Sequence, residues 1–451
     1  MSDTIVTTAA EPDGAPRIAS LDVLRGIAIL GILFMNIDGM GASGLAGARW
    51  PLWIGDWTKL DQIVWFTRQV FPDGTARCLL ELLFGAGMVI LTGRATDRAG
   101  GWRAMRAYYW RNIVLFGFGM VHVFGLLWYG DILHMYALCA LVVFPLRNLP
   151  AKWLIALGLV FATASAVVSM PRIYNIDVEN ERLADVAEHR AAGQPLSRTE
   201  RKAVRSNHGW HRSIRQDRFA VAREDRNRTT NFARWQMQEI RTYTDRIPTD
   251  WSRVLWWFGE ATCTMLIGAG LFKLGILQGQ RKRSVYVWML VMGYLVGGAI
   301  RGIGAWQTIQ FDDSVSFTWS LREFGRLAMT LGHVGLLSLL LSTVRGSALL
   351  KPFAAAGRTA LTIYICQTLI CLWLLYPPLA LGLYVTQGWA ALMATAVVID
   401  AVLLIAANIW VRHFTIAPVE WLWRSIAALR PLPFGRVHAP PPRHAPDLAP
   451  A

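Results

Sequence analysis

The sequence predicts an all-α protein: a polytopic transmembrane helical bundle of about ten spans, with both chain ends on the cytoplasmic side. Apolar residues make up 54% of the 451 residues and the mean hydropathy is +0.35, which is too apolar for a soluble chain of this length. These residues also come in long blocks, near the roughly 20 residues that a helix needs to cross a bilayer. The blocks cover residues 19–39, 77–93, 112–129, 132–147, 153–170, 254–277, 285–305, 322–343, 359–384 and 389–411.

The blocks divide the chain into five parts. Residues 1–16 lack the apolar region of a signal peptide and are expected to form a short disordered tail. Residues 17–170 hold the first five spans, and residues 254–430 hold the last five with a terminal helix on the membrane surface. The polar, arginine-rich segment 171–253 lies between them and is expected outside the cell membrane. The proline-rich segment 431–451 is expected to be a second disordered tail.

The basic residues of the short loops predict the orientation. With the N-terminus in the cytoplasm, every group of them falls on the cytoplasmic side, as the positive-inside rule requires. The groups contain Arg94, Arg98, Arg103, Arg106, Arg111, Arg147, Lys152, Arg281, Lys282, Arg283, Arg345, Lys351, Arg358, Arg412 and Arg424. The net charge of +15 is thereby explained by loops at a membrane surface, and nucleic acid is not an expected partner.

The polar segments also carry helix signals. Ser197 and Glu200 have the spacing of a capping box, and Gly193 followed by Pro195 is a stop signal for the preceding helix. The stretch 60–71 is too polar to span and fits an interfacial helix or a re-entrant piece before the second span.

Arg25 and Asn36 lie on one face of the first span. They are eleven residues apart, so they are nearly eclipsed and about 16 Å apart along the helix axis. This face suits an extended ligand with Arg25 at a phosphate. The alternative is an arginine that reaches the interface beside Asp22, one turn earlier.

His122 lies near the middle of the third span, with Asp131 and His134 close behind it. An ionisable side chain at membrane depth usually faces the bundle interior or a watery cavity. We expect Gly130 to let the helix break, so that Asp131 turns back towards the bundle. The group is then a candidate general base with orienting partners, and the alternative is a structural hydrogen bond between helices.

Further polar residues of the spans suggest a cavity open to the outside, although some of them must pair with one another. They are Glu81, Glu260, Arg301, Arg322, Glu323, Arg326 and, deeper, His333. The five cysteines lie in apolar spans without metal-ligand spacing, so no metal is expected and they are interpreted as packing residues.

Six segments carry a resemblance to a known family. They read L-D-V-L-R-G-I-A-I-L-G-I-L-F-M-N-I at 21–37, L-F-G-A-G at 83–87, H-V-F-G-L-L-W-Y-G-D-I-L at 122–133, L-I-G-A-G-L at 266–271, G-R-T-A-L-T-I-Y at 357–364 and A-P-V-E-W-L-W-R at 417–424. In this order they resemble the YeiB-like bacterial inner-membrane proteins, a domain of unknown function. That family looks distantly similar to transmembrane acyltransferases such as heparan-α-glucosaminide N-acetyltransferase.

The resemblance implies an integral protein of the bacterial inner membrane that takes an acyl group, commonly acetyl, from cytoplasmic acyl-CoA. The acceptor would be a sugar or a lipid-linked hydroxyl or amine on the far side. The R-G-I-A segment at Arg25 and the later Asn36 fit the enzyme's first helix, but its histidine has no counterpart, since residues 37–53 contain none. His122 is then the substitute base and Asp131 its partner.

Further residues have expected roles at this site. Arg25, Asn36, Arg111 and Arg358 would hold the donor; Asp22, Glu81, His134, Glu260, Arg301, Arg326 and His333 are further cavity candidates. Membrane lipids, acyl-CoA and an unidentified acceptor are the expected partners, and a homo-oligomer is left open. The alternative functions are a transporter or flippase of an amphiphile, which needs no base, and a structural or sensory protein acting through 171–253.

Overall fold

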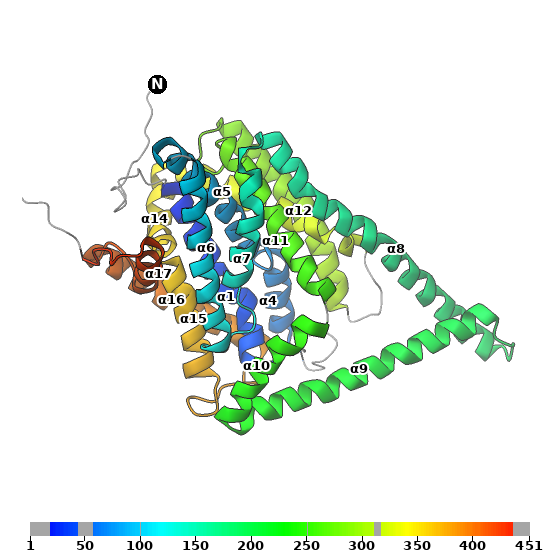
Figure 1. The fold of residues 1–451 in the computed structure, drawn as a ribbon. Coiled ribbons are helices and arrows are strands. Elements are labelled where there is room, and N and C mark those ends of the chain that lie inside the picture. Colours follow the sequence, from blue (N-terminus) through cyan, green and yellow to red (C-terminus); the bar gives the residue numbers. More distant parts are fainter. Residues whose placement is uncertain (1–18, 44–56, 100, 250, 311–316, 436–451) are drawn as a thin grey trace, which may run out of the picture.

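The chain forms a bundle of helices with one long arm (Figure 1), and the computed structural model describes residues 19–43, 57–99, 101–249, 251–310 and 317–435. The helices are α1 (Ala19–Gly41), α4 (Lys59–Val70), α5 (Thr75–Ala99), α6 (Gly101–Phe124), α7 (Leu133–Val143), α8 (Ala151–Ala191), α9 (Arg198–Thr230), α10 (Phe232–Thr249), α11 (Trp251–Lys273), α12 (Arg283–Ile309), α13 (Arg322–Leu341), α14 (Val344–Arg358), α15 (Ala360–Leu369), α16 (Trp389–His413) and α17 (Pro418–Ala428). Short 3₁₀ turns cover Phe144–Asn148 and Phe317–Trp319, and a π-helical turn, Ile370–Leu375, extends α15. The all-α prediction is confirmed, while the predicted tail 1–16 and most of 431–451 lie outside the described residues.

The number of spans differs from the prediction. Every predicted span overlaps a helix, but among the described residues seven helices are long and apolar enough to cross a membrane. An eighth span would be α14 with α15, which meet at a bend of 75°. The predicted spans 112–129 and 132–147 do not qualify, because α6 is interrupted by arginines and α7 is short. The count of about ten is therefore not confirmed.

The stretch 60–71 is confirmed as a helix of its own. It is α4, which begins with a capping box in which Thr58 accepts from the Asp61 amide and Asp61 accepts from the Thr58 amide. The Asp61 carboxylate also accepts from the Ala390 amide, so it caps the first turn of α16 as well.

Close contact between α1 and α14 brings the chain's beginning and its second half together. A Cβ atom at Gly26 would lie 1.9 Å from the Phe353 carbonyl oxygen, and one at Gly357 would lie 1.8 Å from the Asp22 carbonyl oxygen. Only glycine permits these approaches, because any Cβ atom would clash with the backbone of the other helix. Small residues at such contacts let helices in membranes pack closely. The pair places Arg25 beside the end of α14.

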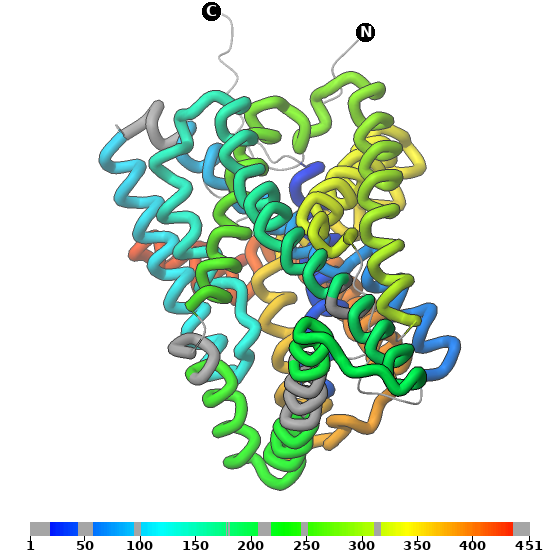
Figure 2. The backbone as a smooth tube through the Cα atoms, turned by 90° about the vertical axis from the view of Figure 1, so that its right-hand side faces the viewer, coloured from blue at the N-terminus to red at the C-terminus, as the bar shows by residue number. Residues whose placement is uncertain are grey.

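Helices α8 and α9 form an arm that leaves the bundle as two sides of a V (Figure 1). Figure 2, turned by 90°, looks along α9, with α8 crossing in front of the bundle. The two sequence signals predicted here are confirmed. Gly193 has a φ of +67° just after α8 ends, and Ser197 and Glu200 form the capping box of α9. The hydrogen bonds from the Ser197 amide and hydroxyl lower the pKa of Glu200.

Arg228 ties the arm to the far end of α1. Its side chain is 1% exposed, and one guanidinium nitrogen donates to the carbonyls of Gly39 and Ala42, at 3.1 and 3.0 Å. Glu239 of α10 pairs with it, and although burial opposes the charge, this carboxylate raises the pKa of Arg228. Ser43 donates to Glu224, one turn before Arg228, at 2.5 Å. The arm therefore returns to the end of α1 opposite Arg25.

We expect the tip of this arm to be exposed outside the cell, because the basic short loops place the start of α1 inside. Ala192→Cys at the arm's exposed turn should react with a membrane-impermeant maleimide on intact cells. Lys282→Cys, in the exposed turn before α12, is the matched control and should react only after the cells are opened. The unsubstituted protein measures the background of the five native cysteines. The reverse pattern would overturn the orientation.

Candidate functional site: a buried Asp–His array

The end of α6 delivers His122 to the bundle interior. The helix stops at Phe124, and Leu127 adopts a left-handed φ of 65°, so the chain leaves the helix axis before Gly130. The predicted break at Gly130 thus occurs earlier, and the predicted span 112–129 is too long. Beyond the helix end, Trp128 packs against Gly130, within 2.5 Å of where a Cβ atom of Gly130 would lie. The turn returns Asp131 to His122, as predicted.

Asp131 holds two histidines at once. Its Oδ1 lies 2.7 Å from His122 Nδ1, and its Oδ2 lies 2.7 Å from His134 Nδ1 and accepts from the His134 amide at 3.0 Å. An ionised carboxylate can only accept, so each histidine donates from Nδ1 and keeps Nε2 for another partner. The carboxylate fixes the tautomer and the orientation of both rings.

The Nε2 atom of each histidine lies near a hydroxyl group. His122 Nε2 lies 2.8 Å from Thr368 Oγ1 of α15, and His134 Nε2 lies 3.4 Å from the Tyr243 hydroxyl of α10. His122 and Thr368 are 0% exposed, whereas His134 lies towards the surface beneath the polar segment. The residues Thr368, His122, Asp131, His134 and Tyr243 are called the Asp–His array below. It leads from the buried centre to the outer helices.

Sequence reasoning predicted three members of the array and missed two. Thr368 comes one turn after Tyr364. The Tyr364 ring lies edge-on against the His122 ring, at 4.8 Å between ring centres. Its hydroxyl accepts from the Ile132 amide at 3.2 Å, behind Asp131.

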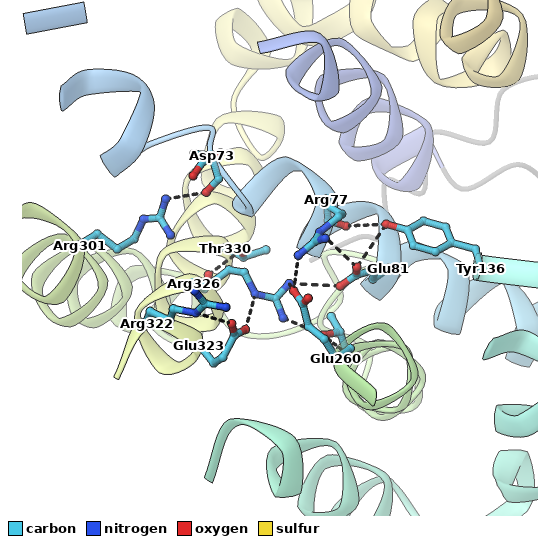
Figure 3. Close-up of polar contacts among 11 residues, drawn as sticks. Asp73, Arg77, Glu81, Tyr136, Glu260, Arg301, Arg322, Glu323, Arg326 and Thr330 are labelled. Carbon is cyan, nitrogen blue, oxygen red and sulfur yellow. Dashed lines mark hydrogen bonds and ion pairs between the residues drawn. The ribbon is translucent and has the colours of Figure 1, made fainter. Parts of the chain in front are cut away.

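A second buried cluster contains the predicted cavity residues Glu81, Glu260 and Arg326 (Figure 3). The Arg326 guanidinium lies 3.2 Å from Glu81, 3.1 Å from Glu260 and 2.9 Å from Glu323. Arg77, which the sequence did not single out, pairs with Glu260 at 2.5 Å. These five residues are called the ionic cluster below. Buried charges need such pairing, so the cluster is satisfied rather than an open cavity.

The remaining predicted cavity candidates lie elsewhere. Arg301 donates to the carbonyl of Val70, the last residue of α4, at 2.8 Å. It also donates to the carbonyl of Asp73, in the turn that follows, at 2.5 Å (Figure 3). His333 lies 2.9 Å from the Tyr294 hydroxyl and 3.3 Å from the Phe71 carbonyl. Neither joins the Asp–His array. No group of three or more histidines, cysteines or carboxylates in the described part of the chain is arranged to hold a metal ion.

The predicted donor-binding arginines lie around the bend between α14 and α15. Arg25, whose side chain is 36% exposed, pairs with Asp22 at 3.2 Å, and Arg358 ends α14. The Arg111 guanidinium stacks 3.9 Å from the ring centre of Trp423 on α17. Asn36 lies farther along α1, half-buried, and is not brought to these arginines.

Helix α17 closes the same bend. Glu420 accepts from the Leu361 and Thr362 amides, at 2.7 and 3.2 Å, and so caps the first turn of α15. Burial raises the pKa of Glu420 despite these hydrogen bonds. The predicted surface helix is thus confirmed as a helix, with its carboxylate turned inward.

The fold and this site define a polytopic α-helical integral membrane protein with a hydrogen-bonded Asp–His array inside its bundle. Residues 271–430 match the family model described as "Protein of unknown function (DUF418)". The chain is 27% identical to the uncharacterized protein YxaH of Bacillus subtilis over 92% of its length and 94% of YxaH. It is also 27% identical to the uncharacterized protein YeiB of Escherichia coli, over 91% of this chain and 96% of YeiB. The predicted resemblance to the YeiB-like proteins is confirmed.

Proposed function

We propose that this chain is a membrane-embedded acyltransferase of the bacterial inner membrane. It would move an acyl group, commonly acetyl, from cytoplasmic acyl-CoA to the hydroxyl or amine of a sugar or lipid-linked acceptor on the far side. The observation that carries the proposal is the hydrogen-bonded series from Asp131 through His122 to a hydroxyl. This arrangement orients a neutral imidazole so that its free nitrogen can take a proton from a hydroxyl group.

Thr368 marks the place of the acceptor. Its hydroxyl lies 2.8 Å from His122 Nε2, within the range that proton abstraction requires. In the reaction the acceptor hydroxyl would replace Thr368 at this nitrogen and attack the thioester carbonyl carbon while His122 takes its proton. The tetrahedral intermediate then loses its carbon–sulfur bond, and the CoA sulfur leaves with the proton from His122. Asp131 stabilises the His122 imidazolium that exists between these two proton transfers.

The positions of three arginines support the proposed binding of acyl-CoA. Arg25 of α1 and Arg358 of α14 lie on two helices that pack closely beside the bend, and Arg111 of α6 stacks on Trp423 of α17. Arginine binds phosphate oxygens through paired N–H groups, so these side chains suit the phosphates of CoA. The pantetheine arm would then extend along the bundle towards His122.

The activity is tested with purified protein in bilayers and radiolabelled acetyl-CoA, in a single-turnover format with extracted membrane lipids and glycans as acceptors. The expected result is label in a non-protein acceptor that forms only when the protein is present. If CoA binds but no acceptor from the membrane is labelled, the proposal fails, and the transporter alternative is tested by lipid movement between leaflets.

Donor binding gives a second prediction. Arg25→Ala should weaken the affinity for CoA about 10- to 100-fold, because a hydrogen bond to a charged group contributes roughly 1.5–3 kcal/mol. Arg25→Lys should fall between, since lysine keeps the charge without the planar fork. Calorimetry on folded variants measures both, and Arg345→Ala, at the exposed start of α14, is the control. An unchanged affinity in Arg25→Ala would leave this arginine as an anchor at the membrane surface.

A further inference from the structure

Asp400 is a carboxyl group in the middle of α16 that no part of the proposed reaction uses. It is 7% exposed and lies where α15 and α1 meet α16. Its Oδ1 accepts from Gln367 Nε2 at 2.9 Å, and the same nitrogen lies 3.3 Å from the Ile29 carbonyl oxygen. Its Oδ2 is buried and has no hydrogen-bond partner among the described residues. One carboxyl oxygen is therefore left without a donor inside the membrane.

The surroundings of Asp400 offer no counter-ion. Helix α16 packs against α1, α4, α14 and α15. The titratable and charged groups on these elements and the π turn are Asp22, Arg25, Asp38, Lys59, Asp61, Arg68, Arg345, Lys351, Arg358, Tyr364, Cys366 and Cys371. Among the described residues, no cation forms an ion pair with Asp400, and Cys371 is the neighbouring titratable group.

Two cations on the helices that pack against α16 are directed elsewhere. Arg25 lies one turn from Ile29 but reaches back to Asp22 at 3.2 Å. Arg68 pairs with Asp38 at 3.3 Å and stacks on Trp389, at the first turn of α16 and far along the helix from Asp400. An ionised Asp400 carboxylate would thus have a single neutral hydrogen-bond donor. Its negative charge would be costly in free energy in an apolar medium.

We propose that Asp400 is a proton-binding site in the membrane interior and that it holds its proton at neutral pH. The neutral acid needs no counter-ion, and its Oδ1 still accepts from Gln367. Ionisation would place a negative charge at the contact that joins α15, α16 and α1. Gln367 directly precedes Thr368, so the proton on Asp400 acts on the same turn of α15 that contacts His122.

The proton is observed by infrared spectroscopy of the protein in lipid nanodiscs. The parent at pH 7 should show the carbonyl stretch of a protonated carboxyl in apolar surroundings, and Asp400→Asn should lack it. The band should disappear reversibly only at a pH well above that at which exposed carboxyls ionise. Asp61→Asn removes a carboxylate at the surface end of α16 and should leave the band unchanged. Absence of the band from the parent at pH 7, or its persistence in Asp400→Asn, overturns the proposal.

A second measurement needs no variant to fold. Dicyclohexylcarbodiimide, which enters membranes, takes the carboxyl proton on its nitrogen, and the carboxylate then adds to its central carbon and rearranges to a stable N-acylurea. Mass spectrometry should locate this adduct on Asp400 at pH 7, with the labelling reduced as the pH rises. Glu81, Glu260 and Glu323 are equally buried but paired with arginines, and they should stay unlabelled. Unmodified Asp400 beside labelled members of the ionic cluster contradicts the proposal.

Discussion

His122→Ala should lower single-turnover acyl transfer by roughly 10²–10⁴-fold while the protein still inserts and binds CoA. The reason is that His122 Nε2 is the nitrogen that meets a hydroxyl, and its other nitrogen is held by Asp131 at 2.7 Å. His122→Gln keeps a polar side chain without a base and should lose as much. Asp131→Asn should cost less, because it removes orientation and charge but leaves the imidazole.

The control for this series is His333→Ala. That histidine also lies on an apolar helix, but it contacts Tyr294 and Phe71 and is not part of the Asp–His array. Its variant should transfer at the parent rate. If the His122 variants do so as well, His122 is a packing residue, and the base must be sought at His134 or Glu81.

Arg326→Leu should lower the free energy of unfolding by about 3–5 kcal/mol, because removing one partner of a buried ion pair leaves an uncompensated charge. Here three carboxylates would lose an ion-pair partner, since Glu81, Glu260 and Glu323 all lie within 3.2 Å of this guanidinium. The measurement is reversible denaturation of the reconstituted protein, followed by tryptophan fluorescence.

Arg322→Leu is the matched control for the ionic cluster. Arg322 contacts the same Glu323, at 3.3 Å, but its side chain is 63% exposed. Exposed ion pairs contribute about 0–1 kcal/mol, so this variant should stay close to the parent. Equal stabilities of the two leucine variants would contradict the prediction. They would mean that the carboxylates become hydrated or protonated when Arg326 is absent.

The sequence was most informative where the chemistry is local. His122, Asp131 and His134 lie within thirteen residues, so a break in the helix suffices to bring them together, and the structure does so. The capping box at Ser197 is local in the same sense. Such features depend on neighbours in the chain, and their geometry follows from helix pitch and turn chemistry.

Features that depend on distant segments could not be predicted. Thr368 is 246 residues from His122, and the sequence does not say which face of α15 meets α6. The pairing of Arg77 with Glu260 joins residues 183 positions apart in the same way. Asp400 was missed for another reason, since one carboxyl in an otherwise apolar block does not disturb the hydropathy pattern of α16.

The complete burial of His122 and Thr368 has a consequence for equilibrium measurements. The described conformation is closed to an acceptor, so binding must draw on a conformation in which α15 or α10 has moved. The apparent dissociation constant then equals the intrinsic one divided by the fraction of molecules in that open form. An acceptor that binds weakly to the resting protein can thus bind the open form tightly, and a substitution far from His122 that favours opening would raise affinity without adding a contact.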